Sequence, residues 1–237
     1  MKNLFYIFLL FICLFCSCVT VKTKRDIQQS DAHFQLGLSY LNNNNIQPAF
    51  VEFQKAIDFD PDNKEAHNMI GVIYLTKLED YSNAIIHFKK ALNLDKNFSE
   101  VYNNLGNAYE KIGKHDEAIE SYKAAIENPL YHNTALALYN IGMLYYKLAR
   151  YDDAMDAFKE SLKRNSDFYL SYYGLALCYN MKGQYDDAAV AISRAIELDP
   201  MYRGNRDKAI EDLRNRKIRA KAEEEKFIAD YLEILKY

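Results

Sequence analysis

The sequence has few cysteines, and most of them lie near its start. Cys13, Cys16 and Cys18 precede the rest of the chain, and only Cys178 lies farther along the 237 residues. One cysteine cannot form a disulfide framework, so that class of fold is excluded for the region after residue 18. We expect Cys178, which lies within a helical apolar pattern, to be a small buried side chain rather than a reactive thiol.

The sequence also lacks an excess of charge of either sign and lacks catalytic motifs. It contains 30 Lys and Arg against 33 Asp and Glu, whereas nucleic-acid-binding domains carry a basic patch. It has no HExxH, GxSxG or P-loop motif, and no CxxC after residue 18. We therefore expect no nucleic-acid partner, no catalytic residues and no enzymatic activity.

What the sequence does contain is a helical unit that occurs five times. In residues 101–129, apolar and small residues follow helical spacing up to Gly113, where a first helix should stop, and again from Ala118 onward. A small residue of the first helix recurs at intervals of 34 to 36 residues, at Gly37, Gly71, Gly106, Gly142 and Ala176. A helical period near 34 with small residues at these places resembles the tetratricopeptide repeat.

This resemblance implies an all-α fold, a right-handed superhelix (α-solenoid) of five clear repeats over residues 30–202. Glycine and alanine are expected where helices approach closely, and aromatic residues where they fill the remaining space. Repeat two has one extra residue near Leu78 to Asp80, which we assign to its inter-helix turn. The run Asn42 to Asn45 falls in the turn of repeat one, where asparagine tolerates left-handed backbone.

The two ends of the sequence differ from the repeats. Residues 203–237 predict one long helix or two that cap repeat five, or a degenerate sixth repeat. Ala209, Ile210 and Leu213 are expected to pack inward, and a second apolar stripe consists of Phe227, Tyr231, Leu232 and Leu235.

At the start, Leu4 to Phe15 is an apolar run typical of a signal peptide, predicted over residues 1–17. Ser17-Cys18 resembles a bacterial lipoprotein cleavage box, which implies that Cys18 carries covalent lipid; bulky residues precede Cys13 and Cys16. The alternative is an uncleaved anchor from Leu4 to Val19. Residues 18–29 are polar and are predicted to be a non-helical tether.

A break in the repeat period distinguishes this sequence from tetratricopeptide repeats in general. A P-x-Y segment, Pro129-Leu130-Tyr131, follows repeat three and precedes Asn140-Ile141-Gly142, and Asn103-Asn104-Leu105-Gly106 lies one repeat earlier. Together with the lipoprotein-like start, these segments resemble the type IV pilus biogenesis lipoproteins, the pilotins of the PilF, PilW and Tgl type. The resemblance implies a lipid-anchored outer-membrane protein that faces the periplasm, binds the secretin subunit of the pilus machine and has no cofactor besides the lipid.

In tetratricopeptide superhelices the first helices line a concave groove, so their residues off the packing positions are candidate partner contacts. The candidates are Phe34, Leu38, Leu41, Met69, Val72, Leu75, Asn103, Asn104, Asn107, Tyr139 and Asn140. We expect the apolar row from Phe34 to Leu75 to bind an apolar segment, unless the tether or the C-terminal helix covers it. A second hypothesis is a periplasmic adaptor that recruits a peptidase or a cell-wall enzyme.

His33 and His67 occupy equivalent places in repeats one and two. Two histidines are too few ligands for a structural or catalytic zinc site. We therefore expect no metal site.

Overall fold

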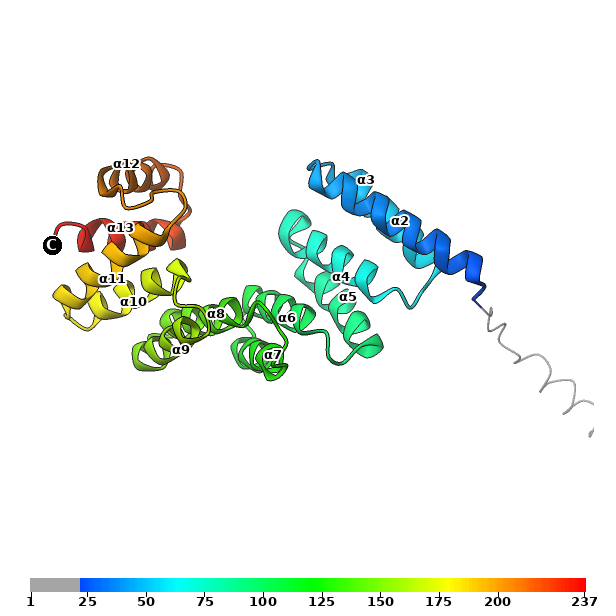
Figure 1. Ribbon diagram of the computed structural model, residues 1–237, viewed down its shortest axis with the longest axis horizontal. Coiled ribbons are helices and arrows are strands. Elements are labelled where there is room, and N and C mark those ends of the chain that lie inside the picture. The colour runs from blue at the N-terminus through cyan, green and yellow to red at the C-terminus, as the bar shows by residue number, and fades with distance from the viewer. Residues whose placement is uncertain (1–21) are drawn as a thin grey trace, which may run out of the picture. The chain divides into compact units, whose positions relative to one another are not determined.

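The computed structural model describes residues 22–237, and within that range every side chain except those of residues 222 and 223. The predicted signal peptide and Cys18 lie outside the described residues. The helices are α2 (Lys24–Asn42), α3 (Ile46–Phe59), α4 (Lys64–Ile73), α5 (Tyr81–Leu94), α6 (Ser99–Lys111), α7 (His115–Glu127), α8 (Thr134–Lys147), α9 (Tyr151–Arg164), α10 (Tyr169–Met181), α11 (Tyr185–Leu198), α12 (Arg206–Lys217) and α13 (Ala222–Ile234) (Figure 1). No β-strand occurs in this part of the chain. Nor does any helix between residues 22 and 237 have the length and hydrophobicity needed to cross a membrane.

The chain divides into two compact units, Met1–Ala66 and His67–Tyr237. The first unit contains repeat one, the α2–α3 pair. The second contains most of α4 and all later helices, which form repeats two to five and the C-terminal pair α12–α13.

The first helix begins earlier than the sequence pattern predicted. Thr23 is the N-cap of α2: its hydroxyl accepts from the Asp26 backbone N–H at 3.1 Å, and the Asp26 carboxylate accepts from the Thr23 backbone N–H at 2.9 Å. This capping box satisfies two backbone donors at the helix start. Residues 24–29 are therefore helical, and the prediction that they belong to a non-helical tether is wrong.

A glycine on the first helix meets a large aromatic ring of the second helix in repeats one to four. A Cβ atom at Gly37, Gly71, Gly106 or Gly142 would lie 2.5 to 2.6 Å from the ring of Phe53, Phe88, Tyr122 or Phe158, respectively. These four aromatic side chains are fully buried. In repeat five Ala176 and Ile192 take the equivalent places, so the added methyl group is matched by a smaller partner. The predicted packing role of the motif residues is confirmed.

The extra residue of repeat two is absorbed inside the first helix, not in the turn as predicted. Tyr74–Leu78 is a π-helical turn that continues α4, and the Asp80 backbone N–H donates to the Tyr74 carbonyl at 3.0 Å. A π-turn accommodates one additional residue within a helix. The following Glu79 has a left-handed backbone, with φ of 52°.

The turn between the two helices of each repeat contains one left-handed residue. Asn44 has φ of 58° in repeat one, which confirms the prediction for the asparagine run. Gly113 and Gly183 take the equivalent places in repeats three and five, with φ of 75° and 72°. Glycine adopts this backbone without the steric cost that a Cβ atom brings.

The C-terminal residues form two helices, and they pack as the sequence predicted. Ala209 and Leu213 of α12 are buried, and Leu235 is buried just after α13. Phe227, Tyr231 and Leu232 are partly buried against the hydrophobic cluster that includes Leu177 and Ile192. In Figure 1, α13 runs beside α10 and α11. The pair therefore covers the last repeat.

The glycine–aromatic contact predicts that the effect of Gly71→Ala on the free energy of unfolding depends on the size of residue 88. Gly71→Ala should lower the free energy of unfolding by about 1–2 kcal/mol, because overpacking against Phe88 costs about 1–3 kcal/mol and the gain in helix propensity is only about 0.5–1 kcal/mol. In a Phe88→Ile background, which copies the Ala–Ile pair of repeat five, the same substitution should be neutral or stabilising. Denaturant unfolding followed by circular dichroism measures both. Equal destabilisation in the two backgrounds would contradict the steric account.

Candidate functional site: a hollow on the first helices of repeats two to four

The predicted apolar row is divided between the two units. Phe34, Leu38 and Leu41 lie on α2 of the first unit and are half-buried, and the Phe34 ring lies 5.6 Å from the ring of Phe53. Met69, Val72 and Leu75 lie in the second unit and are also half-buried. Val72 and Leu75 pack against the core that contains Phe88. These side chains therefore contribute to repeat packing as well as to the surface.

Three of the four asparagines predicted to face a partner make hydrogen bonds between neighbouring repeats. Asn104 Nδ2 donates to Asn68 Oδ1 at 3.1 Å, and Asn140 Nδ2 donates to Asn103 Oδ1 at 3.0 Å. Asn68 and Asn103 are 3% and 5% exposed. Buried amides need such partners because an unpaired buried polar group is costly. Asn103 is therefore a structural link between repeats three and four, and its prediction as an open groove residue is wrong.

Asn107 is held by its own repeat. The Tyr122 hydroxyl donates to Asn107 Oδ1 at 2.7 Å and also lies 3.1 Å from Glu110 Oε2. Glu110 Oε1 in turn accepts from Lys147 Nζ at 2.9 Å, which joins repeat three to repeat four. The Tyr122 side chain, whose ring packs on Gly106, therefore also orients Asn107 and Glu110.

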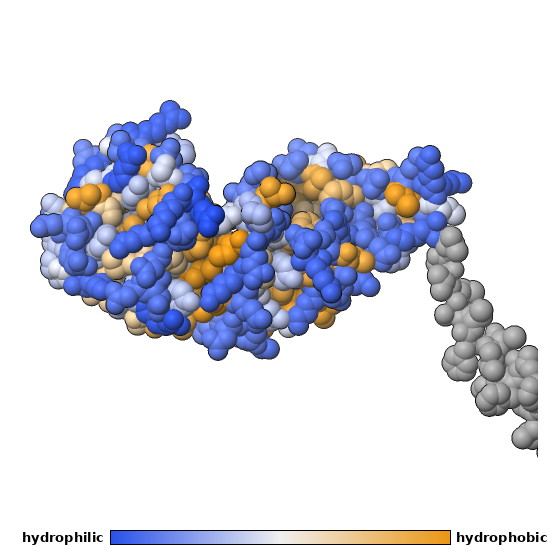
Figure 2. All heavy atoms as spheres, turned by 60° about the horizontal axis from the view of Figure 1, so that its bottom comes forward, coloured by the Kyte–Doolittle hydropathy of each residue, from blue (hydrophilic) through white to orange (hydrophobic). Residues whose placement is uncertain are grey.

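These side chains border a hollow of about 500 Å³ in the second unit. Its lining residues come from the first helices of repeats two to four, from the start of α5 and from α13: Leu75, Thr76, Glu79, Tyr81, Asn107, Glu110, Lys111, Tyr139, Asn140, Met143, Lys147 and Phe227. Figure 2 shows hydrophobic side chains at hollows of a surface that is otherwise mostly polar. The volume lies within the range of ligand-binding pockets in proteins.

The structure brings four of the predicted residues together in this hollow, namely Leu75, Asn107, Tyr139 and Asn140. The apolar side chains of Leu75, Tyr139, Met143 and Phe227 are accompanied by acidic and basic groups such as Glu79, Lys111 and the Glu110–Lys147 pair. An apolar segment flanked by polar residues is the ligand that such a surface fits. From the sequence, Phe227 was predicted only as part of the second apolar stripe of the C-terminal segment. Its contribution to the hollow was missed, because spacing along the chain does not show that it lies beside repeat four.

The equivalent surface of repeats four and five is covered by α13. Tyr146 of α8 is only 6% exposed and its ring lies 5.7 Å from that of Phe227, while the Tyr173 ring of α10 lies 5.3 Å from that of Tyr231. The sequence left open whether the C-terminal helix, rather than a partner, covers the apolar row from Phe34 to Leu75. Within the second unit, the helix covers the later repeats instead.

The histidines make contacts within their own repeats. His33 Nδ1 lies 2.6 Å from Glu52 Oε2 in repeat one, and His67 Nδ1 lies 3.2 Å from His87 Nδ1 in repeat two. Burial, followed by the nearby His67 charge, lowers the pKa of His87 to about 4. Across residues 22–237, no three His, Cys, Asp or Glu side chains are grouped so that they could hold a metal ion. Cys178 is fully buried, as predicted, and burial raises its pKa to about 12.

The asparagine link between repeats three and four can be measured with a double-mutant cycle. Asn140→Ala should cost about 1–3 kcal/mol, because it leaves the buried Asn103 oxygen without its donor. Asn103→Ala combined with Asn140→Ala should cost less than the sum of the two single changes. Denaturant unfolding gives the coupling free energy, and Asn93→Ala on the exposed side of α5 serves as the control. Strictly additive changes would show that the two amides do not interact.

The repeats are also recognised by comparison with known families. Tetratricopeptide-repeat models match residues 30–63, 75–113, 98–166 and 139–203. Over 121 residues the sequence is 31% identical to the type IV pilus assembly protein PilF of Pseudomonas aeruginosa, a match that covers 48% of this chain and 48% of PilF. The chain thus spans about half the length of that relative.

Solved structures agree on the fold. The structure of Pseudomonas aeruginosa PilF aligns with a TM-score of 0.69 at 24% identity, over 88% of this chain and 90% of that one. PilW, described as a widely conserved type IV pilus biogenesis factor, aligns with a TM-score of 0.69 at 22% identity, over 85% and 90% of the two chains. The predicted all-α repeat fold is therefore confirmed, and the chain is a tetratricopeptide-repeat protein similar to PilF and PilW.

Proposed function

We propose that this protein is a lipid-anchored, non-enzymatic assembly factor of a type IV pilus, and that it binds the secretin subunit in the periplasm. The observation that carries the proposal is the hollow on the first helices of repeats two to four in a chain similar to PilF. The hollow presents apolar side chains and no catalytic constellation that we recognise among its lining residues. Binding of a protein segment is the activity that this surface supports best.

The binding segment in the secretin would be a short apolar stretch with polar neighbours. Leu75, Tyr139, Met143 and Phe227 would receive its apolar side chains. The exposed Lys111 and Glu79 would meet its polar flanks, where charge sets orientation more than affinity. Phe34, Leu38, Leu41, Met69 and Val72 remain predicted contacts.

Covalent lipid on Cys18 would attach the protein to the membrane. Three acyl chains, the lipoprotein pattern that Ser17-Cys18 resembles, hold a protein far more firmly than the marginal anchoring of one chain. Val19 occupies the place where aspartate favours retention in the inner membrane in many Gram-negative bacteria. The resemblance therefore favours the outer membrane.

A matched pair of leucine variants tests the binding surface. Leu75→Glu should weaken secretin capture at least ~10-fold, equivalent to about 1.4 kcal/mol, because it places a charge among the apolar lining residues. Leu78→Glu should have no effect, since Leu78 lies in the same π-turn, is 53% exposed and does not line the hollow. Binding is measured by capture of secretin subunits from solubilised envelopes with the acylated protein.

Because Leu75 is half-buried, a second variant separates binding from folding. Thr76 is exposed and lines the hollow, so Thr76→Trp should block the hollow by bulk while circular dichroism stays unchanged. Unchanged secretin capture by both Leu75→Glu and Thr76→Trp would reject the site. Capture of a cell-wall enzyme in place of a secretin would favour the adaptor hypothesis.

The anchor is tested separately. Cys18→Ser should release the protein from the membrane fraction and remove the mass of the lipid, whereas Cys16→Ser should leave both unchanged. Membrane fractionation and intact-mass spectrometry measure the two effects. Persistent membrane attachment of Cys18→Ser at full length would favour the uncleaved anchor from Leu4 to Val19.

A further inference from the structure

Repeat three differs from the other repeats at three places that meet on the first-helix surface. The places are the residue after the first-helix glycine, the fourth residue after it, and the ring that packs on it. In repeats one and two these places hold only apolar residues, namely Leu38, Leu41 and Phe53, and Val72, Leu75 and Phe88. In repeat three they hold Asn107, Glu110 and Tyr122. We call these three residues the polar triad.

The members of the polar triad interact with one another. The Tyr122 hydroxyl lies 2.7 Å from Asn107 Oδ1, a usual length for an O–H···O bond, and 3.1 Å from Glu110 Oε2. Burial, followed by the Glu110 charge, raises the pKa of Tyr122, so the hydroxyl stays protonated and donates. Asn107 Oδ1 is thereby engaged, whereas its Nδ2 donates to no residue between 22 and 237. The triad therefore leaves one amide donor for another molecule.

The packing of the repeat does not require the polar triad. Phe53, Phe88 and Phe158 fill the equivalent place without a hydroxyl, and all three are fully buried, as Tyr122 is. Replacing both partners of a hydrogen bond by apolar groups of the same shape is nearly neutral or stabilising. The apolar set of repeat two would therefore serve the fold of repeat three equally well. The triad needs another reason, and two of its members line the hollow.

The polar triad interrupts an apolar row. Leu75 of repeat two lines the hollow before it, and Tyr139 and Met143 of repeat four line the hollow after it. In Figure 1, α6 of repeat three lies between α4 and α8. A segment that spans the hollow consequently meets apolar, polar and again apolar side chains. An apolar residue opposite the triad would leave the Asn107 amide without a partner, which is costly away from water.

The charges that line the hollow balance. Two lining residues are acidic, Glu79 and Glu110, and two are basic, Lys111 and Lys147. Glu110 and Lys147 are paired with each other at 2.9 Å. The wall around the triad therefore favours neither sign of charge and suits an uncharged polar group.

We propose that the polar triad determines which segment the hollow binds: an apolar stretch with one uncharged polar residue between its apolar residues. The apolar residues contact Leu75 on one side and Tyr139 and Met143 on the other, and an oxygen of the polar residue accepts from Asn107 Nδ2. Tyr122 is a positioning residue, because it acts through Asn107 and Glu110. This inference rests on the proposed function, in which the segment belongs to the secretin.

A variant that copies repeat two into repeat three tests the proposal. Asn107→Val, Glu110→Leu and Tyr122→Phe together reproduce Val72, Leu75 and Phe88. The chain should unfold at the same or a higher denaturant concentration, followed by circular dichroism. Capture of secretin subunits from solubilised envelopes, titrated with the acylated protein, should weaken at least ~10-fold, because the polar residue of the segment loses its partner.

A second buried tyrosine–carboxylate pair supplies the matched control. The Tyr202 hydroxyl donates to Asp212 Oδ2 at 2.6 Å, and neither residue lines the hollow of repeats two to four. Tyr202→Phe with Asp212→Leu removes a similar interaction elsewhere in the second unit, so secretin capture should stay at the wild-type level. An equal loss in this control would show that the effect does not belong to the triad, which overturns the proposal.

Two single variants decide the outcome if the triple variant fails to fold. Asn107→Asp keeps an oxygen for the Tyr122 hydroxyl but replaces the amide donor by an acceptor at nearly constant shape, so capture should fall at least ~10-fold. Tyr122→Phe should weaken capture about 2- to 10-fold, the value of one hydrogen bond.

The outcomes separate this inference from the proposed function. Wild-type capture by a folded triple variant or by Asn107→Asp would overturn the inference and leave the proposed function intact. No secretin capture by the wild-type chain would reject the proposed function and, with it, this inference.

Discussion

The close contact between a first-helix glycine and a second-helix aromatic ring is the constraint on which each repeat depends. With 2.6 Å between a hypothetical Gly71 Cβ and the Phe88 ring, the two helices can approach only if the side chain is absent. Close approach fixes which residues of the first helix turn toward the second and which remain for the opposite surface. In repeat three the same ring carries a hydroxyl that reaches Asn107 and Glu110, so the packing contact also orders that surface.

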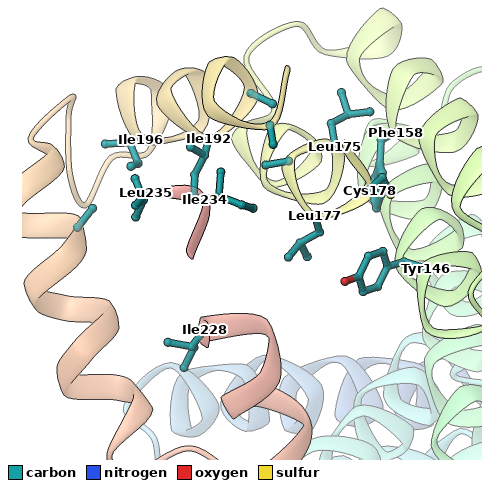
Figure 3. Close-up of a cluster of buried hydrophobic side chains, with 14 of the residues drawn as sticks. Tyr146, Phe158, Leu175, Leu177, Cys178, Ile192, Ile196, Ile228, Ile234 and Leu235 are labelled. Atoms are coloured by element: carbon teal, nitrogen blue, oxygen red, sulfur yellow. The ribbon is translucent and has the colours of Figure 1, made fainter. Parts of the chain in front are cut away.

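The first-helix surface of the second unit is consequently used in two ways. In repeats two to four it is open and mixes apolar side chains with charged ones. In repeats four and five it is occupied by α13, whose Ile228 and Ile234 are buried in the same hydrophobic cluster as Leu177 (Figure 3). The open part of this surface, in repeats two to four, is the part available to a partner under the proposed function. Buried amide pairs such as Asn103–Asn140 keep the repeats in register beneath it.

The repeat period predicted the helices and the core residues of each repeat. It did not predict which side chains make contact between repeats. Glycine spacing placed the helices and the core, because close packing leaves a local signal at Gly37, Gly71, Gly106 and Gly142. Spacing could not tell that Asn103 turns toward Asn140 while Asn107 borders the hollow, since that depends on how successive repeats pack. The π-turn at Tyr74–Leu78 was missed because an inserted residue looks the same in sequence whether the helix or the turn absorbs it. Phe227 was missed as a lining residue because its neighbours come from repeats far away in the chain.

The central claim is that the open hollow of repeats two to four receives the partner. Site-specific photo-crosslinking in intact envelopes tests it most directly, with p-benzoylphenylalanine in place of Tyr139, which lines the hollow, or of Tyr185, which is 49% exposed and lies outside it. The account predicts a crosslink to the secretin from position 139 and none from position 185. A secretin crosslink from position 185 without one from position 139 would contradict it.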